Sequence, residues 1–229
     1  MEVGVVAALE RELRPALRAL GAARTLAPPD PSGSLPRVIY VAPPFRLAAS
    51  GIGTRRADLG ARRLAEGSEG LLSVGFCGGL DDSLRPGDLI LGGIRDFEAS
   101  PGLLELARRT GPHRLGSVAT VDHVVVDLEE KRSIARQTGA LAVEMEAEAV
   151  ATVARNRGIP FLSVKVVLDT PVEPLASSYD GFRRVAWDLL RRPWLVGRMI
   201  GDGNRARGAA RRLGEFFVAF RKELNPSGA

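Results

Sequence analysis

Three carboxylates in this sequence each follow a short, largely apolar segment. They are Glu12, Glu146 and Asp169, and Glu144 stands two residues before Glu146. Ligands of open α/β sheets bind beyond the carboxyl ends of the strands, so acids at such positions can face one site. Two or three carboxylates can cleave a glycosidic bond without a metal ion, because one protonates the leaving group while another activates water. The pattern therefore predicts acid and base catalysis at one edge of a sheet.

Each of these acids also has an ordinary structural explanation. Glu12 could be a solvated acid that offsets the dipole at the start of a helix. Glu144 or Glu146 could cap the helix that follows them. Asp169 precedes a Thr-Pro pair and could be a turn residue. Position alone leaves these alternatives open.

Short apolar runs alternate with amphipathic stretches along most of the chain, which predicts alternating strands and helices. The expected strands cover residues 3–8, 38–41, 46–49, 71–75, 87–91, 114–121 and 161–168, with the region of Val143 between two helices. The expected helices cover about 10–20, 54–66, 101–110, 127–137, 147–157, 180–200 and 204–222. We predict loops at 26–36 and at the glycine-rich segment 76–86, and a turn at 43–44.

Strands that are apolar on both faces favour a central sheet that helices cover on both sides. We therefore predict an α/β fold with three layers, α/β/α, around a central mixed twisted sheet, plus C-terminal helices. One domain is expected over residues 1–229, with a core in 1–175 and a C-terminal helical segment in 176–229.

The composition narrows the class of protein. There is no apolar run of the ~18 residues that a membrane span needs and no secretion signal, so we expect a cytoplasmic protein. Despite a net charge of +5, aromatic residues make up only 5% of the chain, which disfavours nucleic acid as a partner. The single cysteine, Cys77, excludes an intrachain disulfide. His113 and His123 lack a partner at metal spacing, so no metal is expected, and His123 is expected to flank the site.

In this order the segments resemble the nucleoside phosphorylase superfamily, on the branch of the methylthioadenosine/S-adenosylhomocysteine nucleosidases. The resemblance covers residues 1 to about 175 and implies a nucleoside phosphorylase-like fold. It rests on residues 4–12, 50–53, 75–80 with 86–88, 142–146 and 164–169.

The resemblance also implies roles in cleaving a purine nucleoside of the adenosine type. Glu12 would position or deprotonate the attacking water, and Asp169 would protonate the purine at N7. Glu146 would hold the ribose hydroxyls with Met145 packing on the sugar, while Glu144 would order the site. We expect a desolvated environment that raises the pKa of Asp169. Further substrate contacts are expected from Gly53, Phe76, Gly78, Val124 and Val125.

Departures from the superfamily bear on the nucleophile and the substrate. Ser73 and Phe76 stand where phosphorylases carry their phosphate anchors, which favours hydrolysis and no cofactor. Arg55 or Arg56 could still supply an anion site, so phosphorolysis with phosphate as co-substrate is the alternative. Residues 120–125 lack the aromatic ring that the nucleosidases place over the base. A non-catalytic nucleoside-binding protein is a second alternative.

The C-terminal run Trp187–Trp194 is absent from the methylthioadenosine enzymes and resembles the hopanoid-associated nucleoside phosphorylase family. Residues 79–88 and Lys131 before 138–140 share this likeness, which implies adenosylhopane as substrate and a role in hopanoid biosynthesis. The C-terminal segment could contact a membrane or a lipid-linked substrate, or pack on the sheet or on a second subunit. We expect a homodimer at least.

Overall fold

A computed structural model describes residues 1–30, 33–173 and 204–225. Its centre is one mixed sheet with the strand order β2-β3-β4-β1-β5-β10-β6-β7, and β9 joins β8 to β5. Strands β1, β4, β5 and β10 run parallel, whereas β6 runs antiparallel to β10. The strands are β1 (Val3–Ala7), β2 (Ala23–Leu26), β3 (Val38–Ala42), β4 (Phe45–Ala49), β5 (Gly70–Gly79), β6 (Leu89–Gly92), β7 (Arg114–Leu115), β8 (Val118–Thr120), β9 (Ala142–Glu144) and β10 (Phe161–Asp169).

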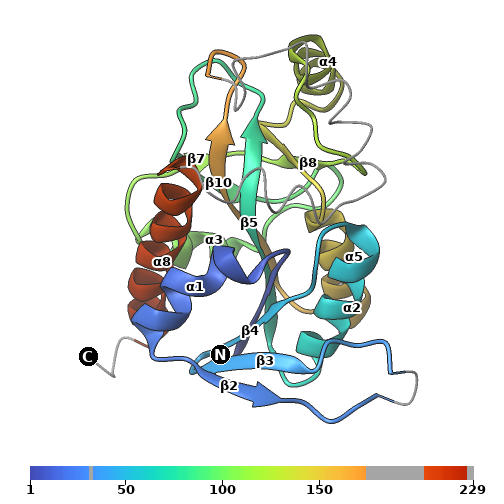
Figure 1. Cartoon of the computed structure of the whole chain (residues 1–229), viewed down its shortest axis with the longest axis vertical. Helices are drawn as coiled ribbons and strands as arrows, with labels where there is room; N and C mark the ends of the chain where they lie inside the picture. The colour runs from blue at the N-terminus through green and yellow to red at the C-terminus, as the bar shows by residue number, and fades with distance from the viewer. Residues whose placement is uncertain (31–32, 174–203, 226–229) are drawn as a thin grey trace.

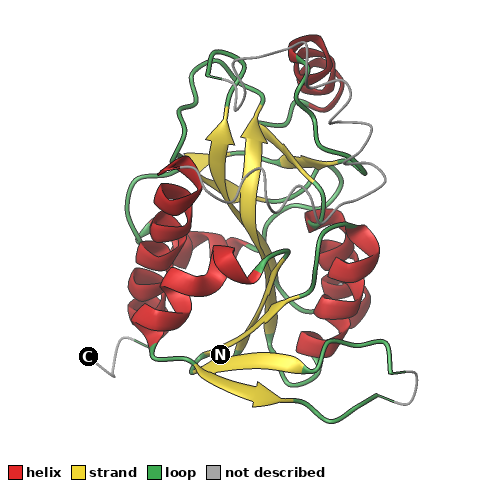
Figure 2. Cartoon of the chain, in the orientation of Figure 1, coloured by secondary structure: helices red, strands yellow, loops and turns green. Residues whose placement is uncertain are grey.

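Helices cover both faces of this sheet (Figure 1, Figure 2). One face carries α1, α3 and α8, and the other carries α2 and α5. Helix α4 lies at the end of the molecule towards which the arrowheads of β5 and β10 point (Figure 1). The predicted three-layer α/β/α fold is therefore confirmed. The helices are α1 (Glu10–Leu20), α2 (Thr54–Ala65), α3 (Pro101–Arg108), α4 (Leu128–Thr138), α5 (Ala147–Arg157) and α8 (Asn204–Leu224).

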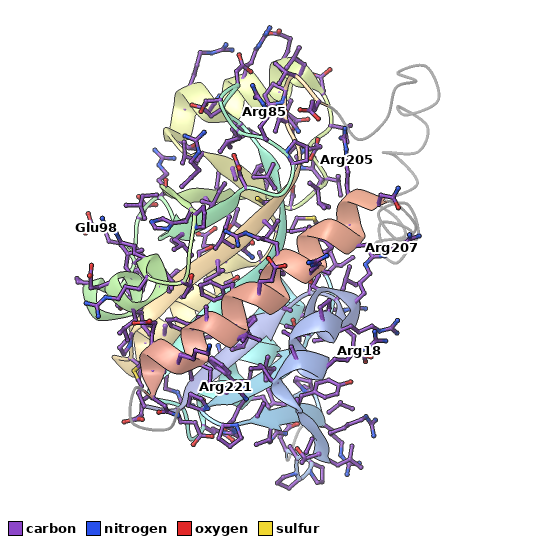
Figure 3. All side chains as sticks on the ribbon, turned by 90° about the vertical axis from the view of Figure 1, so that its left-hand side faces the viewer. Arg18, Arg85, Glu98, Arg205, Arg207 and Arg221 are labelled. Carbon is purple, nitrogen blue, oxygen red and sulfur yellow. The ribbon has the colours of Figure 1, made fainter. Side chains whose placement is uncertain are left out.

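Helix α8 confirms the helix predicted at 204–222, and it belongs to the main core. It lies across the sheet, with Arg205 and Arg207 at its first turn (Figure 3). Its buried side carries Phe217, whose ring meets Phe45 of β4 edge-on at 5.2 Å between centroids. The chain forms this face because alanine, leucine and phenylalanine recur at helical spacing. The helix predicted at 180–200 lies outside the described residues.

Strand β5 corrects one prediction. The glycine-rich residues 76–79 were expected to be loop, but they continue the strand. They do so because Cys77 pairs with Val167 of β10, and Gly78 pairs with Val143 of β9. Cross-strand pairing thus outweighs the low strand preference of glycine.

Two other local predictions also needed correction. The strand expected at 114–121 is two short strands, β7 and β8, separated at Gly116. Strand β2 was not predicted, since its residues are all exposed at the sheet edge and show no alternation. Within the described residues, no helix has the length and apolar character to cross a membrane.

Candidate active site

A pocket opens at the carboxyl ends of β5 and β10, as the positions of the acids predicted. It encloses about 720 Å³ of space, part of it open to solvent. The lining comes from α1, β5, β9, β10 and the loop between β8 and α4. Of the predicted site residues, those on this lining are Glu12, Phe76, Gly78, Val124, Val125, Glu144, Met145, Glu146 and Asp169. Gly53 does not line the pocket but contacts Glu146.

Glu12 is not the solvated helix acid that its position allowed. It lies in the first turn of α1 and is only 4% exposed. One carboxylate oxygen accepts the backbone N–H of Leu9 at 2.8 Å, and the other accepts that of Phe76 at 3.1 Å. Burial raises the pKa of Glu12 despite these two bonds, which lower it.

The fit of Glu12 depends on Gly75 in β5. Gly75 has φ +147°, and a Cβ there would lie 2.9 Å from a Glu12 carboxylate oxygen. A side chain at this position would therefore displace the carboxylate. The glycine lets α1 and β5 meet at the site.

Glu144 serves as the structural centre of the site. Its carboxylate accepts hydrogen bonds from the backbone N–H groups of Glu146 and Ala147. Glu144 therefore caps α5, which was the structural alternative that the sequence left open. It also accepts the Thr120 hydroxyl at 2.5 Å and pairs with the Lys165 ammonium at 2.9 Å. Through these contacts with the backbone, Thr120 and Lys165, Glu144 orders its neighbours.

Lys165 lies at the base of this cluster with 1% exposure. Besides Glu144, its ammonium donates to Ser73 at 3.0 Å. The neighbouring carboxylates raise the pKa of Lys165, although burial alone lowers it. The lysine thus supplies fixed positive charge beneath the acids.

Glu146 is half-buried at the start of α5 and makes no side-chain cap there. One of its oxygens accepts the N–H of Gly53 at 2.8 Å, from the start of α2. Burial, with the charge of Glu144, raises the pKa of Glu146 to about 7. Its second oxygen has no such backbone partner in the described structure and can meet a ligand.

Asp169 ends β10 and is 5% exposed. Its Oδ2 lies 2.5 Å from the Nζ of Lys131, a residue of α4 that is itself 2% exposed. Burial raises the pKa of Asp169, and the charges of Lys131 and Arg205 partly offset this rise. The desolvated environment predicted for this acid is confirmed.

The loop from β8 to α4 forms an aliphatic wall of the pocket, with Val121 and 124–126 on the lining. His123 also lines the pocket, as expected. Its ring nitrogens lie 2.7 Å from Asp122 and 2.7 Å from Glu130 of α4. The histidine therefore links the wall to α4.

The polar and charged residues considered as phosphate anchors, Ser73, Arg55 and Arg56, are not on the pocket lining. Ser73 is fully buried and accepts a hydrogen bond from Lys165. Arg55 and Arg56 are exposed, and the Arg56 side chain lies over Gly51. Among the described residues, those on the pocket lining include no arginine.

Sequence reasoning did not assign Lys131 or Lys165 to the site. A signal was present, because only three of the 32 basic residues are lysines and two of these three are the buried pair partners. Arginine serves at nearly every other basic position. Lysine at these two buried positions therefore indicates a functional or structural requirement that arginine does not meet.

The comparison with protein families now identifies the class. Residues 2–93 and 90–186 match the model of the phosphorylase superfamily. The chain therefore belongs to this superfamily, which confirms the predicted resemblance. By this membership it is an enzyme that cleaves N-glycosidic bonds.

Solved structures show the same fold at low sequence identity. The methylthioadenosine/S-adenosylhomocysteine nucleosidase of Campylobacter jejuni aligns with a TM-score of 0.72 and 21% identity, over 98% of this chain and 99% of that chain. The S. pneumoniae nucleosidase, solved with a transition-state inhibitor, gives 0.72 and 19%, over 98% and 100%. Futalosine hydrolase of Helicobacter pylori gives 0.69 and 22%, over 94% and 97%.

Proposed function

We propose that the protein hydrolyses the N-glycosidic bond of a purine nucleoside of the adenosine type and releases the base. The observation that carries this proposal is the convergence of Glu12, Glu146 and Asp169 on one pocket. Burial raises the pKa of all three, so each can hold or exchange a proton nearer to neutral pH than an ordinary carboxyl. The solved structures of the same fold include nucleosidases and a futalosine hydrolase.

The three acids divide the reaction between them. The bond from C1′ to N9 breaks and its electron pair moves into the purine, while Asp169 gives a proton to N7. Water attacks C1′ and Glu12 takes the proton that this water loses. Glu146 accepts the ribose hydroxyls and stabilises the positive charge that develops on the sugar. Water enters at C1′, the base leaves as the neutral purine, and Glu12 and Asp169 exchange protons with solvent.

Water is favoured over phosphate as the nucleophile by the polar groups near Glu12. The N–H groups of Leu9 and Phe76 fix the two carboxylate oxygens of Glu12, so the remaining lone pairs of these oxygens keep one direction. No arginine on the described lining offers the bidentate grip that phosphate needs.

The test is release of free base from adenosine, 5′-methylthioadenosine and S-adenosylhomocysteine, with and without phosphate. Release that does not need phosphate supports the hydrolase. Release only with phosphate would replace it by the phosphorylase. Binding of these nucleosides without any release would make the protein a nucleoside-binding relative.

Finer predictions accompany this proposal. Membership of the hopanoid-associated branch, with adenosylhopane as substrate, is testable in the same assay, and the aliphatic wall at 124–126 is compatible with an apolar group. For the C-terminal segment 176–229, membrane contact and packing on the sheet or on a second subunit were the two alternatives. Residues 176–203 lie outside the described residues, and vesicle co-sedimentation would test the membrane contact. The homodimer stays a prediction for light scattering, and the cytoplasmic location one for cell fractionation.

A further inference from the structure

Helix α4 reaches an acid of the pocket through one side chain, because Lys131 contacts Asp169. Lys131 is the one residue of this helix that is buried, while Ile134 and Ala135 pack partly buried against a small apolar cluster. The helix begins at Asp127, whose side chain accepts the N–H of Glu130 at 2.9 Å. Lys131 therefore lies in the first turn, where the helix dipole disfavours positive charge. Helix stability therefore does not explain why a lysine stands at position 131.

The explanation lies at the other end of the side chain. The Lys131 ammonium meets Asp169 at 2.5 Å, and both side chains are less than a tenth exposed. Gly78 makes room for this contact, because a Cβ there would lie 3.3 Å from Asp169 Oδ1 and 3.4 Å from Lys131 Nζ. The pair is thus enclosed on the side of β5 and open on the side of the pocket that Asp169 lines.

Few other charges act on this pair. Arg205 of α8 lowers the pKa of Asp169 less than Lys131 does, and it is itself exposed. The thiol of Cys77 in β5 is also near, but burial raises its pKa far above neutrality, so it stays uncharged. Glu130, next to Lys131 in α4, is engaged with His123 at the rim. Burial has the largest effect on the pKa of Asp169, and Lys131 is the charge that opposes it most.

We propose that Lys131 holds the proton that Asp169 passes to the leaving base. The inference rests on the proposed function. As the C1′–N9 bond breaks, Lys131 Nζ gives a proton to the Asp169 carboxylate and this carboxyl passes a proton to N7, so Asp169 ends as the carboxylate. Lys131 is left as a neutral amine, which regains a proton from water after the base departs. It acts through Asp169 and not on the substrate, so it is a positioning residue for the acid.

Lysine suits this task and arginine does not. An amine can lose its proton inside a protein, whereas a guanidinium stays protonated. Lys131→Arg therefore keeps the charge beside Asp169 and removes the transferable proton. Lys131→Met removes both, and the buried Asp169 then keeps its own proton to higher pH. The matched control is Arg132→Met, on the exposed side of the same helix.

The kinetic test measures base release against pH for these variants. We expect Lys131→Arg to lower kcat by about 100-fold with KM within about threefold, as for loss of a general acid. The kcat of Lys131→Met should be highest at acidic pH and fall as pH rises through the pKa of Asp169, whereas the kcat of the wild type stays level over this range. Arg132→Met should match the wild type. Wild-type kcat in Lys131→Arg, or an unchanged pH profile in Lys131→Met, would overturn the proposal.

A second test does not depend on activity. The carboxyl carbon of Asp169, assigned with Asp169→Asn, is followed by ¹³C NMR against pH. It should titrate at higher pH in Lys131→Met than in the wild type, and equal titration would refute the inference. This measurement needs no turnover, so it separates a failure of this inference from a failure of the proposed function.

Discussion

Two sides of the pocket hold their acids in different ways. The carboxylate cluster, made of Glu12, Glu144 and Glu146 with Lys165 beneath, receives backbone N–H groups at every acid. The α4 pair, Lys131 and Asp169, is joined through two side chains, and one comes from a helix with a single buried residue. Backbone N–H groups of the sheet and of the helix N-termini therefore fix the carboxylate cluster. The position of α4 controls Asp169 on the other side of the pocket.

The largest effect should come from the cluster. Glu12→Gln keeps the shape of the side chain but cannot take a proton from water, so kcat should fall by about 10²- to 10⁴-fold. Steady-state base release measures this. The control is Glu10→Gln, two residues earlier on the same helix and half exposed, where activity should not change. A loss of less than tenfold in Glu12→Gln would assign the base to another residue.

A stability measurement sharpens the contrast between the two lysines. Lys165→Met should cost about 3–5 kcal/mol of unfolding free energy, because it leaves the Glu144 carboxylate buried without its cation. Urea denaturation measures this, with the exposed Lys222→Met expected within about 0.5 kcal/mol of wild type. Lys131→Met should cost less than Lys165→Met, since Asp169 borders the pocket and can take up a proton. Equal losses would remove the distinction between the two sides.

Substrate affinity should depend on pH through Glu146. Its pKa is raised to about 7, so the carboxylate that accepts ribose hydroxyls is present above that pH and is lost as pH falls through it. Between pH 8 and pH 6, KM should rise by up to about tenfold, which corresponds to one pKa unit of interaction. Glu146→Gln should abolish this dependence and bind with a constant, weaker KM. A pH-dependent KM that persists in the variant would point to another group.

The smallest effect is expected at His123. Both ring nitrogens face carboxylates, which requires the protonated ring, and the hydrogen bonds to Asp122 and then Glu130 raise its pKa. The link to α4 is therefore complete below the ordinary histidine pKa of about 6.5 and is lost as pH rises through the higher folded value. Amide hydrogen exchange in 124–128 should increase over that rise in the wild type.

The control for this effect is His113→Gln, whose ring contacts the Gly111 carbonyl away from the pocket. Exchange in 124–128 should keep its pH dependence in that variant and lose it in His123→Gln. A dependence that survives in His123→Gln would show that His123 does not hold the wall of the pocket to α4.

Much of this arrangement could be predicted. The positions of Glu12 and Asp169 after apolar runs predicted their place at one sheet edge, because parallel strands end at the same side. Residues 76–79 were mistaken for a loop, because glycine is a turn signal locally and its pairing with β10 and β9 is not visible in sequence. The capping role of Glu144 was left as one of two alternatives for the same reason, since Thr120 and Lys165 meet it only in the folded chain.

The sequence by itself determined the order of strands and helices and the set of acids, because periodicity and the ends of apolar runs are local properties. Tertiary structure alone decided which charge meets which acid. Lys131 precedes Asp169 by 38 residues, and they meet because α4 lies at the end of the molecule towards which β10 points (Figure 1). Such a contact depends on the packing of distant elements, and burial then sets the protonation of the acid.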